Sequence, residues 1–456
     1  MRRGLTWLAL LVGVLSAARV AGQTPPNIVL IVADDLGWAD LSCYALSLWQ
    51  TPNLDRLARE GLRFTDAYAA SCVCSPTRAA LMTGRHPARL HLTTFLPGRK
   101  DMPTQRLLQP VIRQALPREE TTLAELLKAR GYACGHYGKW HLGEGPDSNP
   151  LAQGFDIYRG AVGRYFQFKG PNLVARDEQD YLTDRLTEEA ELFLEANRNR
   201  PFFLYLPHFA VHIPLQAKPD LLAVYEKKAA QVGADLERKN PHYAAVLHSL
   251  DESVGRILKK LDALGLGERT LVVFTSDNGG LSVIEGPNTP ATSNAPLRLG
   301  KGYLYEGGIR VPLLIRWPSV VAPGKTSSVP VRSEDLFMTL VQAAGAQLPA
   351  DREYDGVSLL ALLKGEADGL RRDFLYWHFP HYSNQGGKPS GAIRFGNWKL
   401  IEHYEDGQVE LYHLEQDVGE RHNLAAQHPE VRDKLQRELA SWRQRIRAQM
   451  PLSRER

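Results

Sequence analysis

The residue types best suited to chemistry occur in the segment Cys74-Ser-Pro-Thr-Arg78. Pro76 has a fixed φ and no N–H, so we expect a helix to begin just after Cys74. The free amides of a first helical turn and the guanidinium of Arg78 both favour an anion beside them. A buried free cysteine near a capping proline would give the same pattern. The segment therefore indicates either a nucleophile or a structural cysteine.

Further polar residues follow apolar runs that are typical of buried strands. They are Asp34-Asp35 after residues 27–33, Lys139 and His141 after 132–137, His208 and His212 after 202–206, and Asp277-Asn278 after 271–275. In an open α/β sheet the ligand crevice lies beyond the carboxyl ends of the strands. We therefore expect these side chains to converge, although they are far apart in the sequence.

Four of these residues, Asp34, Asp35, Asp277 and Asn278, offer only oxygen ligands. Oxygen ligands suit a hard cation such as Ca²⁺ or Mg²⁺ and fit zinc poorly. One Asp-Asp pair after a strand is more often a turn or a helix cap. A second acid–amide pair at another strand end favours a metal site, with Ca²⁺ as the first choice.

The elements around these residues predict an α/β fold. Helical patterns at 121–130, 184–198 and 240–264 separate the strands, which is the alternation of a mostly parallel sheet. After residue 360 the chain changes to short strands at 374–379, 392–395, 398–402 and 409–423, followed by a helix at 429–447. We expect a catalytic domain at 23–365 and a smaller α+β subdomain at 366–456.

The N-terminus, residues 1–22, has two early arginines, an apolar run and small residues, which is typical of a signal peptide. The run is too short to span a bilayer, so no membrane span is expected after its removal. Removing its three arginines from the formal net charge of +4 leaves +1. This charge argues against nucleic-acid binding and the signal indicates a secreted or periplasmic protein.

The chain has only four cysteines, so a disulfide scaffold is excluded despite the export signal. Cys43 has Cys72 or Cys134 as a possible partner, and the sequence does not decide between them. With 456 residues and 43% hydrophobic content, the chain can bury a large core.

Five separate segments resemble one known family in the same order along the chain. They are Ile31-Val-Ala-Asp34-Asp35-Leu-Gly37, Cys74 to Arg85, Gly138-Lys139-Trp-His141-Leu-Gly143, Thr275-Ser-Asp277-Asn278-Gly279, and Gly300-Lys301 with Glu306-Gly-Gly-Ile-Arg310. The sequence thus resembles the type I, formylglycine-dependent sulfatases, of the arylsulfatase and N-acetylgalactosamine-sulfatase kind. This resemblance implies an alkaline-phosphatase-like fold, in which helices sandwich a large, mostly parallel sheet.

The resemblance also implies the cofactors and the partners. Cys74 would be oxidised to Cα-formylglycine by a formylglycine-generating or anaerobic sulfatase-maturating enzyme. One Ca²⁺, with Mg²⁺ as the alternative, would be held by the four oxygen-bearing residues and position 74. The implied catalytic residues are Cys74, Arg78, Lys139, His141, His212 and Lys301.

The resemblance further implies a mechanism through a sulfated enzyme intermediate. The formylglycine hydrate would attack sulfur with Asp277 as general base. His212 and Lys301 would contact the sulfate and protonate the leaving oxygen, while Lys139 neutralises the other oxygens. His141 would then deprotonate the second hydroxyl and expel sulfate, with Arg78 holding the hydrate. A thiolate has no such internal route for losing sulfate.

The substrate is expected to be a sulfated carbohydrate. The segment Tyr376-Trp-His378-Phe-Pro-His381-Tyr382 mixes aromatic rings with two histidines, which suits a sugar face and its hydroxyls, although a core strand would look similar. His378 and His381 are the predicted substrate-binding residues of an exo-acting enzyme for galactose or N-acetylgalactosamine sulfates, as in glycosaminoglycan degradation. The alternatives are a phosphonate or phosphate ester hydrolase and a catalytically silent glycan-binding protein.

Overall fold

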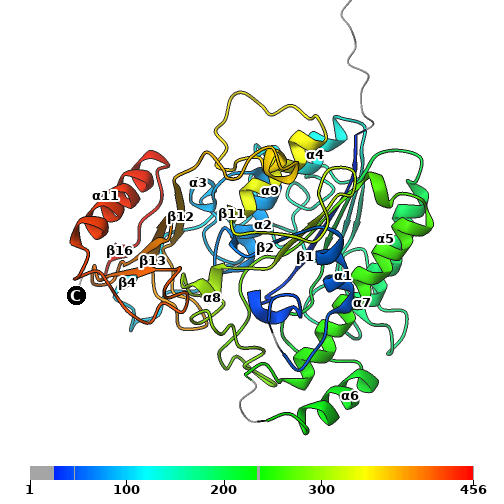
Figure 1. Ribbon diagram of the computed structural model, residues 1–456, viewed down its shortest axis with the longest axis horizontal. Coiled ribbons are helices and arrows are strands. Elements are labelled where there is room, and N and C mark those ends of the chain that lie inside the picture. Colours follow the sequence, from blue (N-terminus) through cyan, green and yellow to red (C-terminus); the bar gives the residue numbers. More distant parts are fainter. Residues whose placement is uncertain (1–24, 46, 234–236, 455–456) are drawn as a thin grey trace, which may run out of the picture.

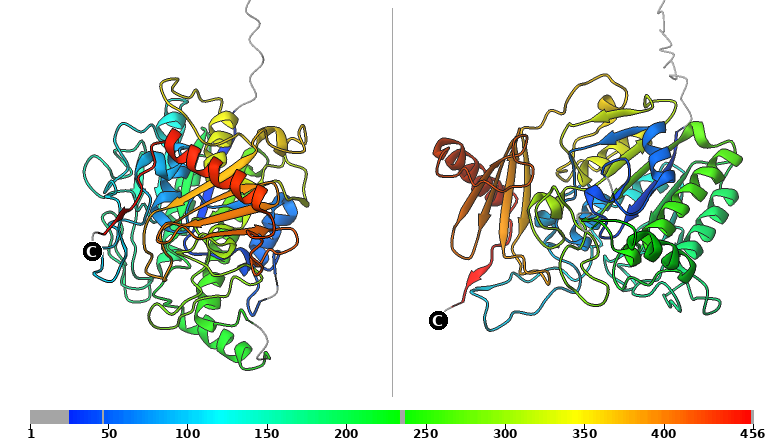
Figure 2. Two further views of the ribbon diagram at one scale, coloured as in Figure 1. Left: turned by 90° about the vertical axis from the view of Figure 1, so that its left-hand side faces the viewer. Right: turned by 60° about the horizontal axis from the view of Figure 1, so that its bottom comes forward.

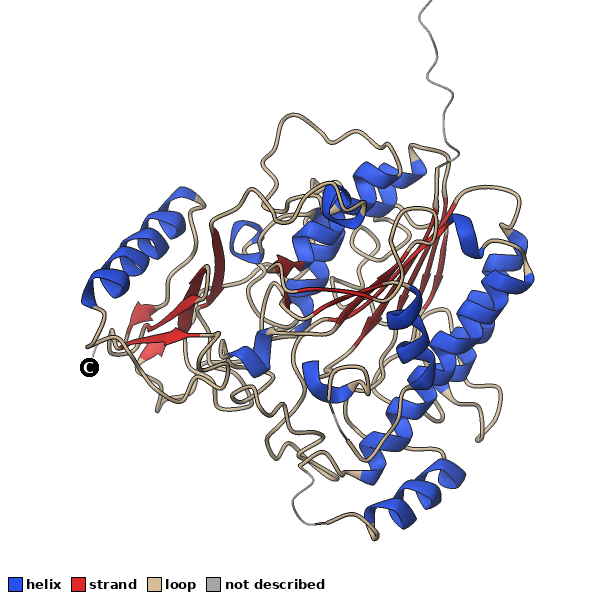
Figure 3. Cartoon of the chain, in the orientation of Figure 1, coloured by secondary structure: helices blue, strands red, loops and turns tan. Residues whose placement is uncertain are grey.

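An eight-stranded mixed sheet forms the centre of the molecule (Figures 1 and 3). The computed structural model describes residues 25–45, 47–233 and 237–454, so the expected signal peptide lies outside the described residues. In sheet order the strands are β10 (Lys325–Ser327), β2 (Leu62–Phe64), β9 (Leu313–Arg316), β8 (Thr270–Ser276), β1 (Asn27–Ala33), β7 (Phe202–Pro207), β5 (Ala133–Tyr137) and β6 (Ile157–Arg159). Strand β9 is antiparallel to both neighbours, and every other pair is parallel.

Helices cover both faces of this sheet, which explains why its central strands are apolar throughout. One face packs against α1 (Pro52–Glu60), α5 (Leu182–Ala196) and α7 (Pro241–Ala263), and the other against α2 (Cys74–Thr83), α4 (Leu123–Lys128) and α9 (Ser333–Ala343). Helix α6 (Pro219–Ala229) packs on α7, and α10 (Leu360–Leu363) packs on α9. In β1, Val29 and Ile31 point to the first face, while Ile28 and Leu30 point to the second. The predicted α/β class is confirmed.

A separate four-stranded antiparallel sheet follows, with strands β12 (Phe374–Phe379), β13 (Ser390–Phe395), β14 (Trp398–His403) and β15 (Val409–His413). One face packs against α11 (Pro429–Arg445) through Ile393, Leu400 and Leu439. The opposite face, with Trp377 and Ile401, packs on Tyr68 and Ile309 of the larger part. Figure 2 shows this sheet between α11 and the rest of the molecule.

Short elements complete the described chain: η1 (Trp38–Asp40), β3 (Ala67–Tyr68), α3 (Pro87–Leu90), β4 (Leu107–Leu108), η2 (Gly267–Arg269), α8 (Glu306–Ile309), β11 (Val331–Arg332) and β16 (Leu452–Ser453). All four cysteines are free, so neither disulfide left open by the sequence is present. No helix among the described residues has both the length and the apolar character needed to cross a membrane.

Candidate active site

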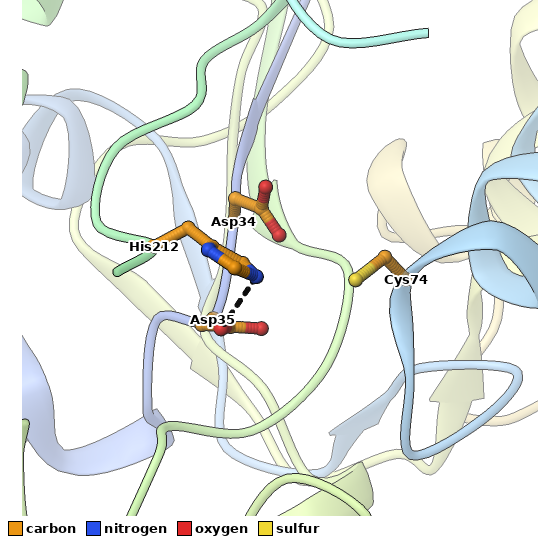
Figure 4. Close-up of side chains that lie close together, drawn as sticks. All are labelled: Asp34, Asp35, Cys74 and His212. Atoms are coloured by element: carbon orange, nitrogen blue, oxygen red, sulfur yellow. Dashed lines mark ion pairs between the residues drawn. The ribbon is translucent and has the colours of Figure 1, made fainter. Parts of the chain in front are cut away.

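The carboxyl ends of four neighbouring strands bring the predicted site residues together. Asp34 and Asp35 follow β1, Lys139 follows β5, His212 follows β7, and Asp277 follows β8. Helix α2 brings Cys74 to them from across the crevice (Figure 4). One ligand atom from each of Asp34, Asp35, Cys74 and His212 lies within 4.8 Å of the others. The expected convergence is therefore present in the fold.

Two lysines neutralise the two consecutive aspartates. Lys139 Nζ donates to Asp34 Oδ2 over 2.6 Å, and Lys301 Nζ donates to Asp35 Oδ2 over 2.7 Å. Both lysine side chains are almost fully buried. Buried charges persist only when they are paired and hydrogen-bonded, so the two acids and the two lysines depend on one another.

Arg78 joins three parts of the site, and its side chain is completely buried. Its Nε and Nη2 both donate to Asp277 Oδ2, over 2.9 and 2.7 Å, and Nη1 donates to the Lys139 carbonyl over 2.8 Å. Nη2 also lies 3.7 Å from Asp34 Oδ1. The guanidinium fork thus fixes Asp277 and the loop after β5 relative to α2.

The oxygen ligands of the site fit a hard divalent cation. Asp34 Oδ1 and Asn278 Oδ1 are buried and have no hydrogen-bond partner in the described chain. Asn278 Nδ2 donates to Asp35 Oδ1 over 2.8 Å, which turns the amide oxygen away from that carboxylate. Buried oxygens without partners are costly unless a cation satisfies them. The donor set is therefore compatible with Ca²⁺ or Mg²⁺.

The electrostatics of the acids point the same way. Burial alone would raise the pKa of Asp34, but the charges of Lys139, Arg78 and Lys301 hold it well below its usual range. The pKa of Asp277 is raised to about 7 by burial and next by the charge of Asp34, against the opposing effect of Arg78. Two adjacent carboxylates resist full ionisation, and a divalent cation between them would remove that repulsion.

The two histidines of the site have defined tautomers. His212 Nδ1 lies 2.6 Å from the Ile213 carbonyl and must donate to it, so Nε2 accepts from Lys301 Nζ at 3.0 Å. His141 Nε2 donates to the Leu96 carbonyl over 2.8 Å, and its buried Nδ1 has no partner. Burial, followed by the charge of Lys139, lowers the pKa of His141 to about 3. His141 is thus a neutral imidazole with a free acceptor nitrogen.

The environment of Cys74 differs from one sequence expectation. Helix α2 begins at Cys74 itself, with Val73 as its N-cap. The sequence indicated that an anion would be favoured here, yet burial raises the pKa of the Cys74 thiol to about 12, and the nearby Lys139 and Lys301 only partly oppose this. Desolvation outweighs the helix terminus and the cations, so the unmodified residue is a neutral thiol.

Glycines allow the site loops to approach one another closely. Gly138 has a φ of +134°, and a Cβ at this position would lie 1.9 Å from the Pro207 carbonyl oxygen. A Cβ on Gly279 would lie 1.8 Å from the Gly307 carbonyl oxygen. Any larger residue would push the loops after β5 and β8 away from their neighbours, and with them Lys139 and Asp277.

A cavity of about 710 Å³ opens onto Cys74, Lys139, His141, His212 and Lys301. Its outer wall comes from Tyr158 on β6 and from loop residues, which are Phe95, Glu144, Lys169, Glu285, Asn384 and Gln385. Two of these loops, 143–154 and 285–296, are rich in Gly, Pro and Asn, a composition that indicates loops at the rim of a crevice. No motif or periodicity selects the individual side chains within them.

The structure does not bring His378 and His381 to this cavity. Both rings are buried, at 3% and 2% exposure. His378 bonds to the Tyr404 hydroxyl and the Gln449 carbonyl, and His381 bonds to the Thr93 hydroxyl. His208 also lies in the core, with its Nε2 beside the Ser253 hydroxyl. The geometry gives His378 and His381 internal hydrogen-bonding roles.

The fold and this cluster define a hydrolase with the alkaline-phosphatase-like architecture, and comparison with known proteins narrows the class. The sulfatase family model matches residues 26–346, and a model described as N-sulphoglucosamine sulphohydrolase, C-terminal, matches residues 299–445. The chain belongs to the sulfatase family.

Individual relatives agree with this assignment. Arylsulfatase A of Homo sapiens is 36% identical, with 90% of this chain and 85% of that protein covered. N-acetylgalactosamine-6-sulfatase of Mus musculus is 33% identical, with 94% and 88% covered. The solved structure of Ps i-CgsB in complex with k-i-k-neocarrahexaose is 31% identical, with a TM-score of 0.78 and coverage of 92% and 93%. The protein is a sulfuric ester hydrolase.

Proposed function

We propose that this protein is an exported sulfatase that removes sulfate from a carbohydrate sulfate ester, acting from the chain end. One observation carries the proposal: the side chain at position 74 faces Asp34, Asp35 and His212 within 4.8 Å, with Lys139 and Lys301 bound to the same acids. A pocket that gathers buried cations around a helix-borne nucleophile suits an anionic ester group.

The proposed nucleophile is the hydrate of formylglycine, formed from Cys74 by a maturating enzyme. The neutral, buried thiol supports this choice, because a thiol with a pKa near 12 is a poor nucleophile at neutral pH. An aldehyde hydrate carries two hydroxyls, one to attack sulfur and one to drive loss of sulfate from the sulfated enzyme. The polar groups for both steps lie around position 74.

A divalent cation, Ca²⁺ or Mg²⁺, would be held by Asp34, Asp35, Asp277 and Asn278. When bound it would supply positive charge that favours the ionised hydrate and the sulfate oxygens. The remaining chemistry belongs to the chain itself. Arg78 orients Asp277, which acts as general base, and Lys139 offers its charge to a non-bridging sulfate oxygen.

The proton transfers follow from the tautomers of the two histidines. His212 Nε2 accepts a hydrogen bond from Lys301, so the proton available to a leaving alcohol is on Lys301, and His212 orients that ammonium group. His141 Nδ1 is unprotonated and unpartnered, which suits removal of a proton from the second hydroxyl. Lys301 is thus the general acid, Asp277 the general base of the first step and His141 the general base of the second.

The relatives support a sugar as the carrier of the sulfate. One relative is named N-acetylgalactosamine-6-sulfatase, and Ps i-CgsB was solved in complex with a neocarrahexaose. We propose a galactose or N-acetylgalactosamine sulfate as the substrate, and residues 366–456 as the subdomain that completes the pocket. Asn384 and Gln385 of this region line the cavity.

The proposal is tested at position 74. The Cys74→Ser variant, made in a host that oxidises only cysteine, should lose at least about 100-fold of the turnover of 4-nitrophenyl sulfate, because serine yields no aldehyde. Mass spectrometry of the tryptic peptide should find the aldehyde in the wild type and an unmodified serine in the variant. The Cys134→Ser variant, at a buried cysteine outside the site, is the matched control and should stay active. Near-native turnover by Cys74→Ser would refute the covalent scheme.

A further inference from the structure

The cavity is strongly polarised along its depth. Its inner end holds Lys139 and Lys301, both almost fully buried, beside Cys74. Its outer wall carries two carboxylates, Glu144 and Glu285. In the described part of the chain neither carboxylate forms an ion pair, whereas both inner lysines do. The cavity therefore combines a cationic inner end with two carboxylates on its outer wall that no cation of the described chain neutralises by direct contact.

Glu285 is held in place by the smaller sheet. Gln385 Nε2, on the loop after β12, donates to Glu285 Oε2 over 2.6 Å. Gln385 is 8% exposed, and its main-chain carbonyl accepts a hydrogen bond from the Tyr303 hydroxyl. The Glu285 amide also donates to the Thr289 hydroxyl over 2.8 Å. A carboxylate fixed in this way is a preorganised acceptor for substrate donors.

The surrounding wall suits a polyhydroxylated ring. Phe95 and Tyr158 provide aromatic faces, and Asn384 adds an exposed amide. Aromatic faces with a few fixed acceptors are the usual means of binding a sugar face and its hydroxyls. A purely apolar leaving group would shield the Glu285 carboxylate from water and offer no donor to its remaining acceptor sites, which is unfavourable.

The same carboxylates are unfavourable for a second anionic group on the substrate. Like charges at close range in a partly dehydrated cavity repel, and Lys169 is the one cation of the described outer wall. An additional sulfate or a uronic acid beside the reacting sugar would meet Glu285 and Glu144. Discrimination between substrates is achieved as much by such repulsion as by attraction.

We propose that Glu285, positioned by Gln385, is a specificity-determining residue that binds hydroxyls of the sulfated sugar and selects singly sulfated, otherwise neutral sugars over multiply charged ones. This inference rests on the proposed function and adds the substrate's charge class to it.

The test compares three substrates: 4-nitrophenyl sulfate, the best monosulfated sugar from a panel of galactose and N-acetylgalactosamine sulfates, and the same sugar with one more sulfate. The measured quantity is the ratio of kcat/KM for the monosulfated to the disulfated sugar. In Glu285→Gln we expect this ratio to fall by about tenfold, because one charged hydrogen bond is lost and one repulsion is removed. Wild-type discrimination should also weaken at 0.5 M NaCl, since salt at ~0.1 M already screens charges beyond about 10 Å.

Three further variants sharpen the comparison. Gln385→Met removes the donor that holds Glu285 and should shift the same ratio in the same direction by a smaller factor. Lys169→Gln removes the outer cation and should shift the ratio in the opposite direction. Glu178→Gln makes the same substitution as Glu285→Gln at a surface carboxylate outside the cavity, and should leave the ratio unchanged.

The outcomes separate the two proposals. An unchanged ratio in Glu285→Gln, or equal losses on all three substrates, would overturn the specificity role while leaving the sulfatase intact. Failure of the aldehyde-bearing wild type to release sulfate from any of the substrates would refute the proposed function, and this inference with it.

Discussion

At the scale of single residues, the site distributes one demanding task among several groups. Hydrolysis of the most inert esters requires transition-state stabilisation on the order of 20 kcal/mol, and one preorganised donor supplies roughly 3 to 4 kcal/mol. Arg78, Lys139, Lys301 and the two histidines together offer several such contacts around position 74. No single group suffices, so removal of one that is outside the buried ion pairs, such as His141, should leave a slow but folded enzyme.

His141 provides a sharp test of this division. The His141→Ala variant should lower kcat by about 10² to 10⁴, because its Nδ1 is the proposed base for the second proton transfer. KM should change little, since the ring is not expected to bind the sugar. The His422→Ala variant, at a histidine whose side chain is 80% exposed, is the control.

The pH dependence of His141 follows from the direction of its pKa shift. A histidine whose pKa is lowered to about 3 stays unprotonated through neutral and mildly acidic pH, so it creates no acidic limb between pH 5 and 7. The pH profile of kcat should therefore have the same shape in the wild type and in His141→Ala between pH 5 and 7. Finding such a limb near pH 6 would contradict the assignment of a neutral, buried base.

Part of the inner site was predictable from strand ends alone, whereas Arg78 and Lys301 follow no strand and were indicated by the resemblance to the sulfatase motifs. Asp34, Lys139, His212 and Asp277 meet where parallel strands end, as expected. The outer wall was not predictable in this way. Glu285 and Gln385 lie on different loops, 100 residues apart in the sequence. Only the folded chain brings Gln385 Nε2 to 2.6 Å from Glu285 Oε2.

At the scale of elements, burial explains which predictions succeeded. Strands β1 and β8 are buried on both faces, so their apolar runs fixed their type and nearly their ends. Strand β12 was also predicted with its observed bounds. Successive side chains of a strand point to opposite faces of the sheet, and the bounds alone do not tell which face a given side chain lies on. Trp377 packs toward the larger part, so the adjacent His378 points to the α11 side, next to Tyr404. The sequence does not reveal which face meets the cavity.

Glu410 on β15 connects the smaller sheet to the segment before α8. Its Oε2 accepts hydrogen bonds from the hydroxyls of Tyr305 and Tyr412, each over 2.8 Å. Burial raises its pKa, but bonds from His403, Tyr305 and Tyr412 outweigh burial and lower the pKa to about 2. The carboxylate thus contributes stability above its unfolded pKa near 4.5, and this contribution is lost as the pH falls toward 2.

We therefore expect Glu410→Gln to lower the free energy of unfolding by about 1 to 2 kcal/mol at pH 7, a figure reduced for the partial exposure of the side chain. The difference from wild type should shrink steadily between pH 5 and pH 2, as measured by urea denaturation. Glu415→Gln, at an exposed carboxylate two residues beyond β15, is the control. A difference that grows on acidification would show that the sign of the pKa shift is wrong.

At the scale of the whole molecule, the smaller sheet packs on the larger part through one apolar cluster, and residues from both parts line one cavity. Lys399 on β14 pairs with Glu306 of α8 and with Glu420, each over 2.9 Å, and all three side chains are completely buried. Breaking such a group by removing one partner is strongly destabilising, so the ion pairs tie the smaller sheet to the larger part. This rigid contact places Asn384 and Gln385 opposite the strand ends of the larger sheet.

The balance of charge across this shared cavity separates sulfate from phosphate chemistry. The carboxylates of Asp34, Asp35 and Asp277 face the cations of Arg78, Lys139 and Lys301, so the cluster is close to neutral before an ion binds. A divalent cation adds two positive charges, which an ionised nucleophile and a singly charged sulfate ester would neutralise. A phosphate monoester would add a further negative charge in a buried site.

We expect kcat/KM for 4-nitrophenyl sulfate to exceed that for 4-nitrophenyl phosphate by about 100-fold or more, because the additional charge remains uncompensated. Chelation by EGTA should lower both rates and the melting temperature, and added Ca²⁺ should restore them, since a ligand that binds only the folded state stabilises it. Equal or faster cleavage of the phosphate ester would favour the phosphate or phosphonate hydrolase alternative. Among the described residues one acidic cluster with metal-binding geometry is present, and it is the cluster at position 74. With a single cation in this cluster, the charge of a sulfate ester is balanced and that of a phosphate monoester is not, and the expected preference for the sulfate ester rests on this difference.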